Sequence, residues 1–388
     1  MILILAITGI VTTESCKEKT AVAKFASAET PVGTPSSTDL FKKYELNKIT
    51  LPEGFSISVY AEIENARSMC LSPSGTLFVG NRDKDNVYAI VDNNKDGVAD
   101  KIYKVASGLN TPNGVAFKDG TLYIAAISTI YRLENIEANL AKPPKPVVVY
   151  DKYPKDTHHG WKFIAFGPDG KLYIPVGAPC NICEKENPVY ASITSINADG
   201  TNMQVYASGV RNSVGFTWHP ITKQLYFTDN GRDMLGDNKP EDELNTAPEK
   251  GMHFGYPYCH QGTILDPEFG NGKNCSDYTA PIQTLGPHTA SLGLRFYTGS
   301  KFPAKYKNAL FIAQHGSWNR STPLGYRVMV STMDAYGKLA KAVPFAEGWL
   351  QSDGTVNGRP VDMQLMPDGS MLVSDDYKGV IYRISYKG

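Results

Sequence analysis

The 388-residue sequence has no excess of charge of either sign. Lys and Arg together number 39, and Asp and Glu together also number 39. This balance argues against a nucleic-acid-binding protein and against a protein held to anionic lipid by charge alone. The N-terminal apolar run, residues 1–11, is too short to span a bilayer. Charge therefore does not indicate which class of molecule this protein binds.

Motifs for several common chemistries are also absent. The sequence contains no GxGxxG, no GxxxxGK[ST], no HExxH and no GxSxG. These motifs bind dinucleotides, nucleotide phosphates or zinc, or carry a nucleophilic serine. Enzymes that use nicotinamide or nucleotide cofactors, and serine hydrolases, are therefore disfavoured.

The N-terminus is typical of an export signal. Residues 1–11 fit the apolar region of a signal peptide, although no basic segment precedes them. Cys16 follows at the distance expected of a lipid-modified cysteine, with Thr13 where such a motif normally has Leu. The alternative is soluble secretion after residues 26–28, which read Ala-Ser-Ala. Both interpretations place the protein outside the cytoplasm, with a signal over 1–16 and a flexible tether over 17–49.

The remaining cysteines fit an oxidising compartment. Cys180 and Cys183 form a CxxC motif, which serves as a redox motif, a metal half-site or a small structural disulfide. No second CxxC completes a zinc site, so we favour the disulfide. Cys259 and Cys275 flank a loop rich in Gly and Asn and are expected to pair as well, whereas Cys70 is expected to be a buried free thiol.

A repeated turn and strand gives the strongest indication of the fold. Gly and Pro number 35 and 25, and Tyr and Phe 22 and 15, as in a turn-rich β protein. One unit, a turn followed by an apolar strand, recurs at roughly 45- to 85-residue intervals, which is typical of propeller blades. The six copies span residues 72–80, 117–125, 167–177, 219–231, 305–316 and 366–376.

These repeats predict an all-β fold, a six-bladed β-propeller over residues 50–388. The strand at 55–61 should complete the sheet begun by the last strands and close the ring. No long amphipathic helix is expected, although residues 133–142 could form a short one. The alternative is a β-sandwich, which does not need six copies of one unit. In a propeller, functional residues should lie just before or after the repeated strands, where one loop per blade meets the axis.

A pair of histidines precedes one of the repeated strands. His158 and His159 open the segment HHGWKFIAFGPDG. A lone histidine is often structural, but this pair stands where a propeller binds ligands. Histidine takes up a proton near neutral pH, which suits a general base for alcohol oxidation.

Arginine and acidic residues occupy equivalent places in the later repeats. Arg211 and Asn212 precede the fourth repeated strand; Arg211 could stabilise developing negative charge or be a surface ion-pair partner. A loop rich in carboxylates and amides, residues 228–243, suits Ca²⁺ but could also be a solvated acidic loop. Further arginines stand at Arg320 and Arg359, and three arginines facing one axis suggest a ligand with several carboxylates.

A separate acidic segment matches half of a known calcium loop. Asp92, Asn94, Asp96 and Asp100 follow the first half of an EF-hand, but the twelfth position is Tyr103. A Ca²⁺ site and an ordinary Asx-rich turn both remain open.

The chain resembles the sugar dehydrogenases that use pyrroloquinoline quinone (PQQ), and within them the sorbosone dehydrogenase and pyranose dehydrogenase branch. The resemblance covers roughly residues 50–385 and rests on the order of many short strings. They include LNTPNGVAF (109–117), HHGWKFIAFGPDGKLYIPVG (158–177), GVRNSVGF (209–216), TDNGRDMLGDNKPEDELN (228–245), HTASLGLRFYTG (288–299), HGSWNRS (315–321) and GRPVDMQLMPDG (358–369).

The resemblance implies roles for individual residues. His159 would be the catalytic base, and Arg211 would hold the reactive carbonyl oxygen of the quinone. His158 should point to the other side by strand alternation. The remaining cofactor contacts would come from Asn113, Lys162, Asn212, Asn319, Arg320, Arg359 and Asp362. The carbonyls of Gly231 and Arg232 would bind the Ca²⁺ on PQQ, and Glu243 with the carbonyl of Phe254 a second, structural Ca²⁺.

The resemblance implies an exported dehydrogenase that oxidises a sugar or related alcohol or aldehyde by hydride transfer to Ca²⁺-bound PQQ. The protein would be periplasmic or lipid-anchored outside a bacterial membrane. The sequence has no CxxCH for haem attachment, so electrons would pass to a separate quinone or cytochrome. Two alternatives remain: a cofactor-free propeller that binds carbohydrate or protein, and a lactonase-like metal hydrolase.

Overall fold

The computed structural model describes residues 29–30 and 37–388. The expected signal over 1–16 with Cys16, the alternative cleavage site at 26–28 and most of the expected tether lie outside the described residues. No helix in the described part of the chain is long and apolar enough to cross a membrane.

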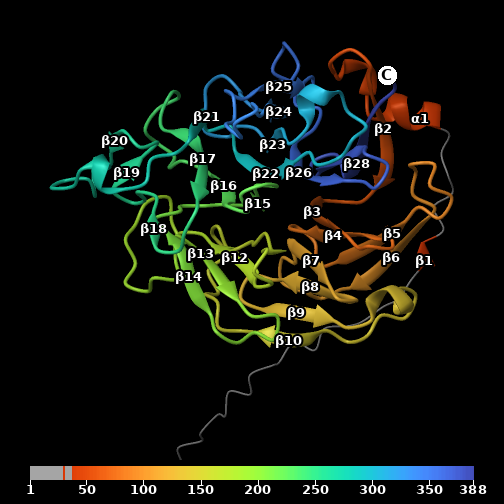
Figure 1. Cartoon of the computed structure of the whole chain (residues 1–388), viewed down its shortest axis with the longest axis horizontal. Coiled ribbons are helices and arrows are strands. Elements are labelled where there is room, and N and C mark those ends of the chain that lie inside the picture. The colour runs from red at the N-terminus through yellow and green to blue at the C-terminus, as the bar shows by residue number, and fades with distance from the viewer. Residues whose placement is uncertain (1–28, 31–36) are drawn as a thin grey trace, which may run out of the picture.

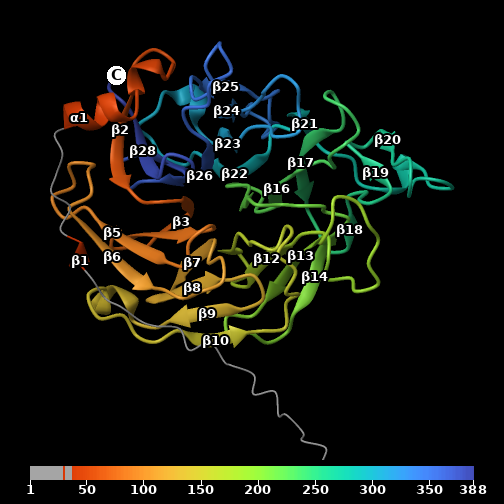
Figure 2. The same cartoon turned by 180° about the vertical axis from the view of Figure 1, so that it is seen from behind.

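Six blades follow one another in chain order around a central axis, as Figures 1 and 2 show from opposite sides. The predicted six-bladed β-propeller is confirmed. The first three blades, each listed from the axis outward, are β3 (Ala66–Leu71), β4 (Leu77–Asn81), β5 (Val87–Val91), β6 (Lys101–Ala106) and β1 (Glu29–Thr30); β7 (Gly114–Lys118), β8 (Thr121–Ala125), β9 (Ile130–Leu133) and β10 (Val147–Tyr150); and β11 (Ala165–Phe166), β12 (Leu172–Val176), β13 (Ser192–Ile196), β14 (Gln204–Ser208) and β18 (Met252–His253).

The other three blades have four strands each. They are β15 (Phe216–Trp218), β16 (Leu225–Asp229), β17 (Glu241–Ala247) and β21 (Gln283–Pro287); β22 (Ser291–Phe296), β23 (Leu310–Gln314), β24 (Arg327–Ser331) and β25 (Val343–Ala346); and β26 (Pro360–Leu365), β27 (Met371–Asp375), β28 (Val380–Tyr386) and β2 (Phe55–Glu62).

The sixth blade closes the ring with a strand from the start of the propeller. β2 pairs antiparallel with β28, from Phe55 opposite Tyr386 to Glu62 opposite Val380. In Figure 1 the orange β2 lies beside the blue β28. The closure predicted from residues 55–61 is confirmed, and it ties the two ends of the propeller together through main-chain hydrogen bonds.

The repeated units form the second strand of each blade. Asp119 and Gly120 form the two-residue turn between β7 and β8, with φ angles of 49° and 76°. Two successive positive φ angles match the twist of a hairpin, and glycine adopts them without steric cost. The second strands of the other five blades are buried along their length; β4, β12, β16, β23 and β27 have no exposed residue. This burial explains their continuous apolar character.

Two segments differ from the sequence expectation or refine it. Part of the expected tether is packed: α1 (Ser37–Lys43) and the 3₁₀ helix η1 (Leu46–Lys48) cover blades five and six. Leu40, Tyr44 and Leu46 are buried there among residues such as Trp349, so the folded part begins before residue 50. The short helix considered at 133–142 is a 3₁₀ helix, η2 (Ile136–Asn139).

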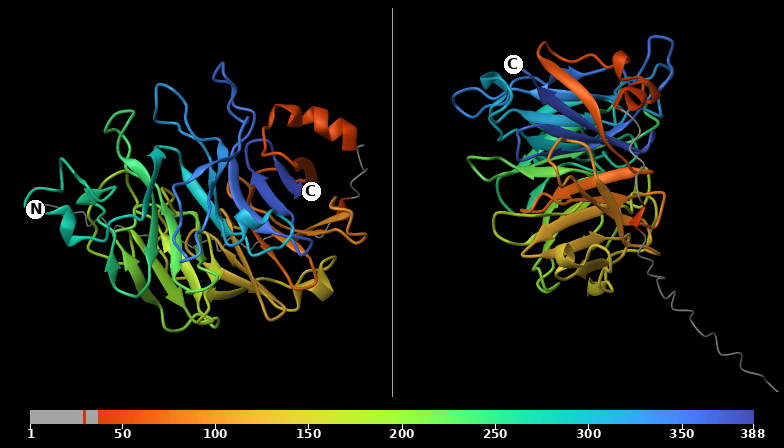
Figure 3. Two further views of the ribbon diagram at one scale, coloured as in Figure 1. Left: turned by 45° about the horizontal axis from the view of Figure 1, so that its top comes forward. Right: turned by 90° about the vertical axis from the view of Figure 1, so that its right-hand side faces the viewer.

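A hairpin insertion projects from the fourth blade. β19 (Cys259–His260) and β20 (Ile264–Leu265) stand at the edge of the ring in Figures 1 and 2, and the tilted view of Figure 3 shows them extending beyond it. Two further 3₁₀ helices are η3 (Cys275–Asp277), which ends this insertion, and η4 (Ala304–Tyr306). As expected, the Cys259–Cys275 disulfide closes the insertion, Cys180 is bonded to Cys183, and Cys70 is a free thiol. Cys70 is only partly buried, whereas the sequence predicted a buried residue.

Candidate active site

A pocket of about 330 Å³ lies where loops from five blades converge. Except for Asp242, near the start of the third strand of its blade, its residues come from the start of first strands or the end of second strands and the loops there. These positions share one end of the propeller, because the two strands run antiparallel. His159 precedes β11, Arg211 precedes β15 and Arg359 precedes β26, so the loops expected to carry function do meet in one place.

His159 presents one free ring nitrogen. Its Nδ1 lies 2.8 Å from the carbonyl oxygen of Ala178. A carbonyl oxygen only accepts, so Nδ1 carries the proton and donates it to Ala178. Nε2 of the neutral ring is then left with a lone pair. His159 is buried and lines the pocket, so its Nε2 is suited to accept a proton from a ligand there.

The surroundings keep His159 neutral. Burial, the Arg211 guanidinium and His158 together hold the pKa of His159 well below 6.5. Close packing also fixes the ring: a Cβ added to Gly177 would lie 2.5 Å from the Cβ of His159. His159 itself adopts a φ of 51° in a turn. This turn, and not the strand alternation assumed from the sequence, leaves His158 exposed while His159 is buried.

Arg211 is held rigidly beside it. Its Nε donates to the main-chain oxygen of Asn181 at 2.8 Å, and its Nη2 to Asn181 Oδ1 at 2.9 Å and Asp233 Oδ2 at 3.1 Å. Its Nη1 donates to the oxygen of Asn230 at 3.1 Å. Within the described part of the chain, these bonds use four of the five guanidinium N–H groups, and one Nη1 N–H is left for a ligand.

Buried carboxylates fix the main chain around Arg211. Asp229 accepts from the main-chain N–H of Arg211 at 2.8 Å and of Asn212 at 2.7 Å. Asp242 accepts from the N–H of Gly231 at 3.1 Å and of Ser291 at 2.9 Å, which joins two blades. Burial raises the pKa of Asp229 and of Asp242. These side chains therefore orient the loops of the pocket.

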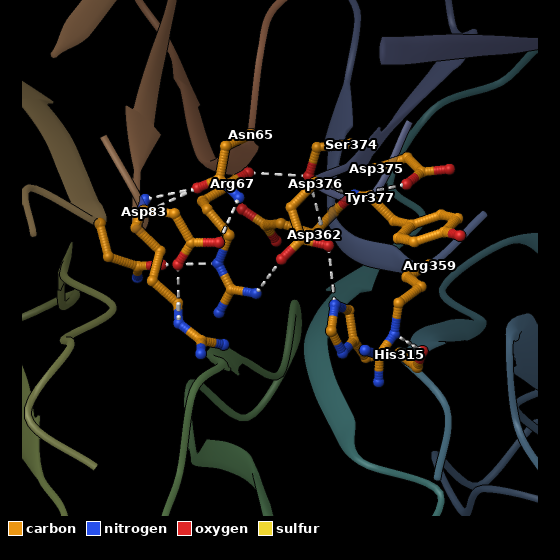
Figure 4. A network of polar contacts seen from close by, with 12 residues as sticks. Asn65, Arg67, Asp83, His315, Arg359, Asp362, Ser374, Asp375, Asp376 and Tyr377 are labelled. Atoms are coloured by element: carbon orange, nitrogen blue, oxygen red, sulfur yellow. Dashed lines mark hydrogen bonds and ion pairs between the residues drawn. The ribbon is translucent and has the colours of Figure 1, made fainter. Parts of the chain in front are cut away.

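A second cationic group faces the pocket from blades one, five and six (Figure 4). Asp376 bridges Arg67 Nη1 at 2.9 Å and His315 Nε2 at 2.8 Å. Burial lowers the pKa of His315 to about 4, so the ring is neutral and donates to Asp376. Arg359 donates through Nε to the main-chain oxygen of His315 and through Nη2 to that of Gly316.

The pocket contains polar atoms that need a ligand. Trp161 Nε1 and His288 Nδ1 are buried and have no hydrogen-bond partner among the described residues. His288 Nε2 donates to the oxygen of Gly236 at 2.9 Å, and its Nδ1 lies 3.9 Å from Asp233 Oδ1. Buried polar groups are normally paired. The free Trp161 N–H, beside Arg67, Arg82, Arg211 and Arg359, thus fits a polar, anionic ligand.

The structure separates the predicted site residues into two sets. His159, Arg211, Asn212, Gly231 and Arg359 line the pocket together. The others are not among its lining residues: Asn113, Lys162, Asp362, Asn319, Arg320, Arg232, Glu243 and Phe254.

Several of the second set bind protein groups instead. Asn113 Oδ1 accepts from Arg67 Nε at 2.9 Å. Lys162 is buried, which lowers its pKa to about 7, and its Nζ donates to Gly160. Asp362 accepts from the N–H of Met69 at 2.9 Å and of Met363 at 2.8 Å. These side chains support the walls of the pocket.

Two further side chains belong to neighbouring loops. Asn319 Nδ2 donates to Asp233 Oδ1 at 3.4 Å, and Arg320 donates to the main-chain oxygens of Asp237 and Thr322. Their loop connects β23 to β24 at the edge of the pocket. Contact with a ligand by these two residues stays a prediction.

The acidic segment behind Gly231 holds no evident metal cluster. Among residues 29–30 and 37–388, no three His, Cys, Asp or Glu side chains are grouped to hold a metal ion. The Arg232 side chain pairs with Asp266 and Glu268, so only its carbonyl remains for a cation. Glu243 is buried, and burial and the neighbouring Asp229 raise its pKa.

The fold and pocket define a six-bladed β-propeller whose axial pocket combines a neutral histidine with clustered arginines. The chain belongs to the TrAA12-like family, whose family model matches residues 49–387. An uncharacterized protein of Borreliella burgdorferi is 35% identical over 357 residues, 87% of this chain and 91% of that protein. The pyrroloquinoline quinone-dependent pyranose dehydrogenase of Coprinopsis cinerea is 28% identical over 47% of this chain and 31% of its own length.

Solved structures share the fold at low sequence identity. The holo PQQ domain of pyranose dehydrogenase from Coprinopsis cinerea has a TM-score of 0.72 at 20% identity, covering 87% of this chain and 97% of that one. The calcium structure of the Trichoderma reesei family AA12 enzyme has a TM-score of 0.76 at 18% identity, with the same coverages. The PQQ-bound aldose sugar dehydrogenase of Streptomyces coelicolor has a TM-score of 0.61 at 17% identity, covering 87% and 99%.

Proposed function

We propose that this protein is a PQQ- and Ca²⁺-dependent dehydrogenase that oxidises a sugar or a related alcohol or aldehyde. One observation carries the proposal: a neutral His159 with a free Nε2 faces an axial pocket in which Arg211 is rigidly held. A module that only binds carbohydrate has no need of a base opposite a fixed arginine. The sequence relative from Coprinopsis cinerea is a PQQ-dependent pyranose dehydrogenase, and the structural neighbour from Streptomyces coelicolor is a PQQ-bound aldose sugar dehydrogenase, which supports the proposal.

The pocket suits PQQ, which is a tricarboxylate o-quinone. Arg67, Arg82 and Arg359 would bind its carboxylates, because guanidinium and carboxylate match in geometry and charge. The free Trp161 Nε1 would donate to one of its oxygens. Asn212 would contact the cofactor from the loop that carries Arg211. Asn113, Lys162 and Asp362 would support the pocket through their hydrogen bonds to protein groups.

When bound, PQQ supplies the two-electron oxidant that accepts hydride from the substrate carbon. His159 removes the proton of the substrate hydroxyl at Nε2, and its Nδ1–H bond to Ala178 keeps the ring oriented during this transfer. Arg211 stabilises negative charge through its remaining Nη1 N–H. Its other bonds are already made in the free protein, so it needs no reorganisation.

Calcium would depend on main-chain oxygens. The carbonyls of Gly231 and Arg232 would hold the ion together with the cofactor. The absence of a cluster of three acidic or histidine side chains within 37–388 is consistent with a site made largely by carbonyls and the ligand. A second ion would be held by Glu243 and the carbonyl of Phe254, and would compensate the buried charge of Glu243.

The protein would act outside the cytoplasm. Two disulfides in the described residues support an oxidising compartment, either periplasmic or at the outer face of a membrane through Cys16. A separate quinone or cytochrome would take the electrons.

The test is reconstitution. Protein purified with a chelator should not reduce an artificial dye in the presence of sugars, and PQQ with Ca²⁺ should restore the activity. Sorbosone, glucose and other aldoses would be compared as substrates. Binding of sugar without dye reduction at saturating PQQ and Ca²⁺ would instead support a cofactor-free binding propeller.

A further inference from the structure

The loop that follows β12, residues 178–183, binds the side chains of both His159 and Arg211. No residue of this loop lines the pocket. Its Ala178 accepts from His159 Nδ1 and donates its own N–H to the main-chain oxygen of Arg211 at 2.8 Å. Asn181, three residues later, binds the Arg211 side chain. The geometry of the pocket thus depends on a loop that a ligand does not touch.

Asn181 makes four hydrogen bonds to site residues. Its main-chain oxygen accepts from Arg211 Nε at 2.8 Å, and its Oδ1 accepts from Arg211 Nη2 at 2.9 Å. The same Oδ1 accepts from the N–H of Asp233 at 2.8 Å, and Nδ2 donates to the oxygen of Asp233 at 3.1 Å. Asn181 therefore fixes the guanidinium from two directions. Through its bonds to Asp233, Asn181 also connects the guanidinium to the loop that contains Gly231.

The disulfide closes the chain around this residue. Cys180 immediately precedes Asn181, and Cys183 follows it by two positions. The N–H of Cys183 donates to Tyr256 Oη at 3.0 Å, which anchors the small loop to the segment that follows β18. The bridge limits the conformations open to a loop that otherwise contains no regular structure.

The position of the bridge argues against the two other roles considered for the CxxC motif. None of the described cysteines lines the axial pocket, so the two sulfurs are not placed to exchange electrons with a ligand there. Both sulfurs are consumed in the bridge, so they do not form a metal half-site.

We propose that Asn181, constrained by the Cys180–Cys183 disulfide, is a positioning residue that fixes the Arg211 guanidinium beside His159. Its importance for oxidation rests on the proposed function, but the positioning itself is a property of the protein without cofactor. Loss of the Asn181 side chain removes the acceptor for Arg211 Nη2 and the two bonds to the Asp233 main chain. The proposal predicts that this loss loosens the guanidinium and changes the field at His159.

The first test uses the protein without cofactor. The His159 imidazole would be titrated by NMR in the wild type, Asn181→Ala, Asn181→Asp and Ile182→Ala. Burial lowers the pKa of His159 most, and the Arg211 charge lowers it further. A loosened guanidinium should therefore raise this pKa in Asn181→Ala, although burial still holds it below 6.5. Ile182→Ala alters the same loop without touching a hydrogen bond to Arg211 and should match the wild type. Asn181→Asp keeps an acceptor for Arg211 Nη2 and should lie between them.

The second test measures PQQ binding by quenching of tryptophan fluorescence. Asn181→Ala should raise the Kd for PQQ by roughly 10- to 100-fold, as expected for a disturbed charge-assisted contact. The double variant Cys180→Ala/Cys183→Ala should weaken binding in the same direction, whereas Cys259→Ala/Cys275→Ala should not. Thermal midpoints of the cofactor-free variants separate these effects from unfolding.

The outcomes distinguish the two proposals. An unchanged His159 pKa in folded Asn181→Ala overturns the positioning role. So does an equal increase of Kd in both double cysteine variants. If the wild type binds no PQQ, the proposed function fails, and the NMR titration still decides the role of Asn181.

Discussion

Replacement of His159 tests the chemical assignment most sharply. Because Nδ1 is bound to Ala178, Nε2 is the ring nitrogen of His159 that can accept a proton from a ligand in the pocket. His159→Ala removes that acceptor while it leaves the arginines in place. PQQ affinity should then change little, and kcat should fall by roughly 10² to 10⁴, the usual contribution of a positioned general base. At 1.36 kcal/mol per factor of ten, this corresponds to about 3 to 5 kcal/mol of activation free energy.

The pH dependence gives a second measure of the same residue. The neutral form is the active one, so the rate falls as pH drops through the pKa of His159. Because burial and Arg211 hold this pKa well below 6.5, the acid limb should lie below that pH. The assay is steady-state dye reduction across pH, with bound PQQ measured in each variant.

His158→Ala is the matched control. His158 is adjacent in sequence but exposed, and it does not line the pocket. A small loss is expected. Full activity in His159→Ala, or a larger loss in His158→Ala, would refute the assignment of the base.

Three further substitutions test other parts of the site. Arg211→Ala should weaken both PQQ binding and turnover, unlike His159→Ala; equal effects of the two variants on PQQ affinity would contradict the separate roles. Gly177→Ala places a methyl group 2.5 Å from the Cβ of His159, so kcat should fall with PQQ affinity nearly unchanged, as measured by dye reduction and fluorescence titration. Glu243→Gln should change how the free energy of unfolding depends on pH. In the wild type, the raised pKa of Glu243 means that the native state keeps a proton that the unfolded chain releases above about pH 4.5. Wild-type stability therefore falls as pH rises from there. Urea unfolding with a chelator should give a shallower decline for Glu243→Gln, and parallel curves for the two proteins would count against a raised pKa of Glu243.

The fold was accessible from the sequence because each blade carries its own local signals. The Asp119-Gly120 turn and the buried β8 after it form a unit that needs no distant information, and six such units specify the number of blades. The closing strand at 55–61 could be expected because the last blade lacked a fourth strand. The helix α1 was missed because the Ala, Thr, Ser and Pro around it lack periodicity, and its one clear signal is the apolar pair Leu40 and Tyr44.

The site was predictable to the level of loops but not of side-chain direction. Lys162 and Trp161 are neighbours in sequence, yet Trp161 lines the pocket and Lys162 is directed at Gly160. Sequence position does not reveal such a difference in a short irregular segment. His288 could have been found, because it precedes β22 as His159 precedes β11. The position of Arg67 in the pocket could not be predicted from the sequence, because Arg67 is held by Asp376, which lies 309 residues away.

The role of Asn181 could not be predicted from the sequence either. The CxxC motif was evident, but its contact with Arg211 arises only when blades three and four come together. The sequence could therefore favour a disulfide at Cys180 and Cys183 and not indicate what the disulfide supports.

The most direct test of the central claim is a crystal structure of the protein grown with PQQ and Ca²⁺. We predict PQQ in the axial pocket, with its carboxylates on Arg67, Arg82 or Arg359, a quinone oxygen on Arg211, and Ca²⁺ on the carbonyl of Gly231. His159 Nε2 should face the open side of the quinone. An axial pocket without PQQ at saturating concentration, in protein whose fold is intact, would contradict the account.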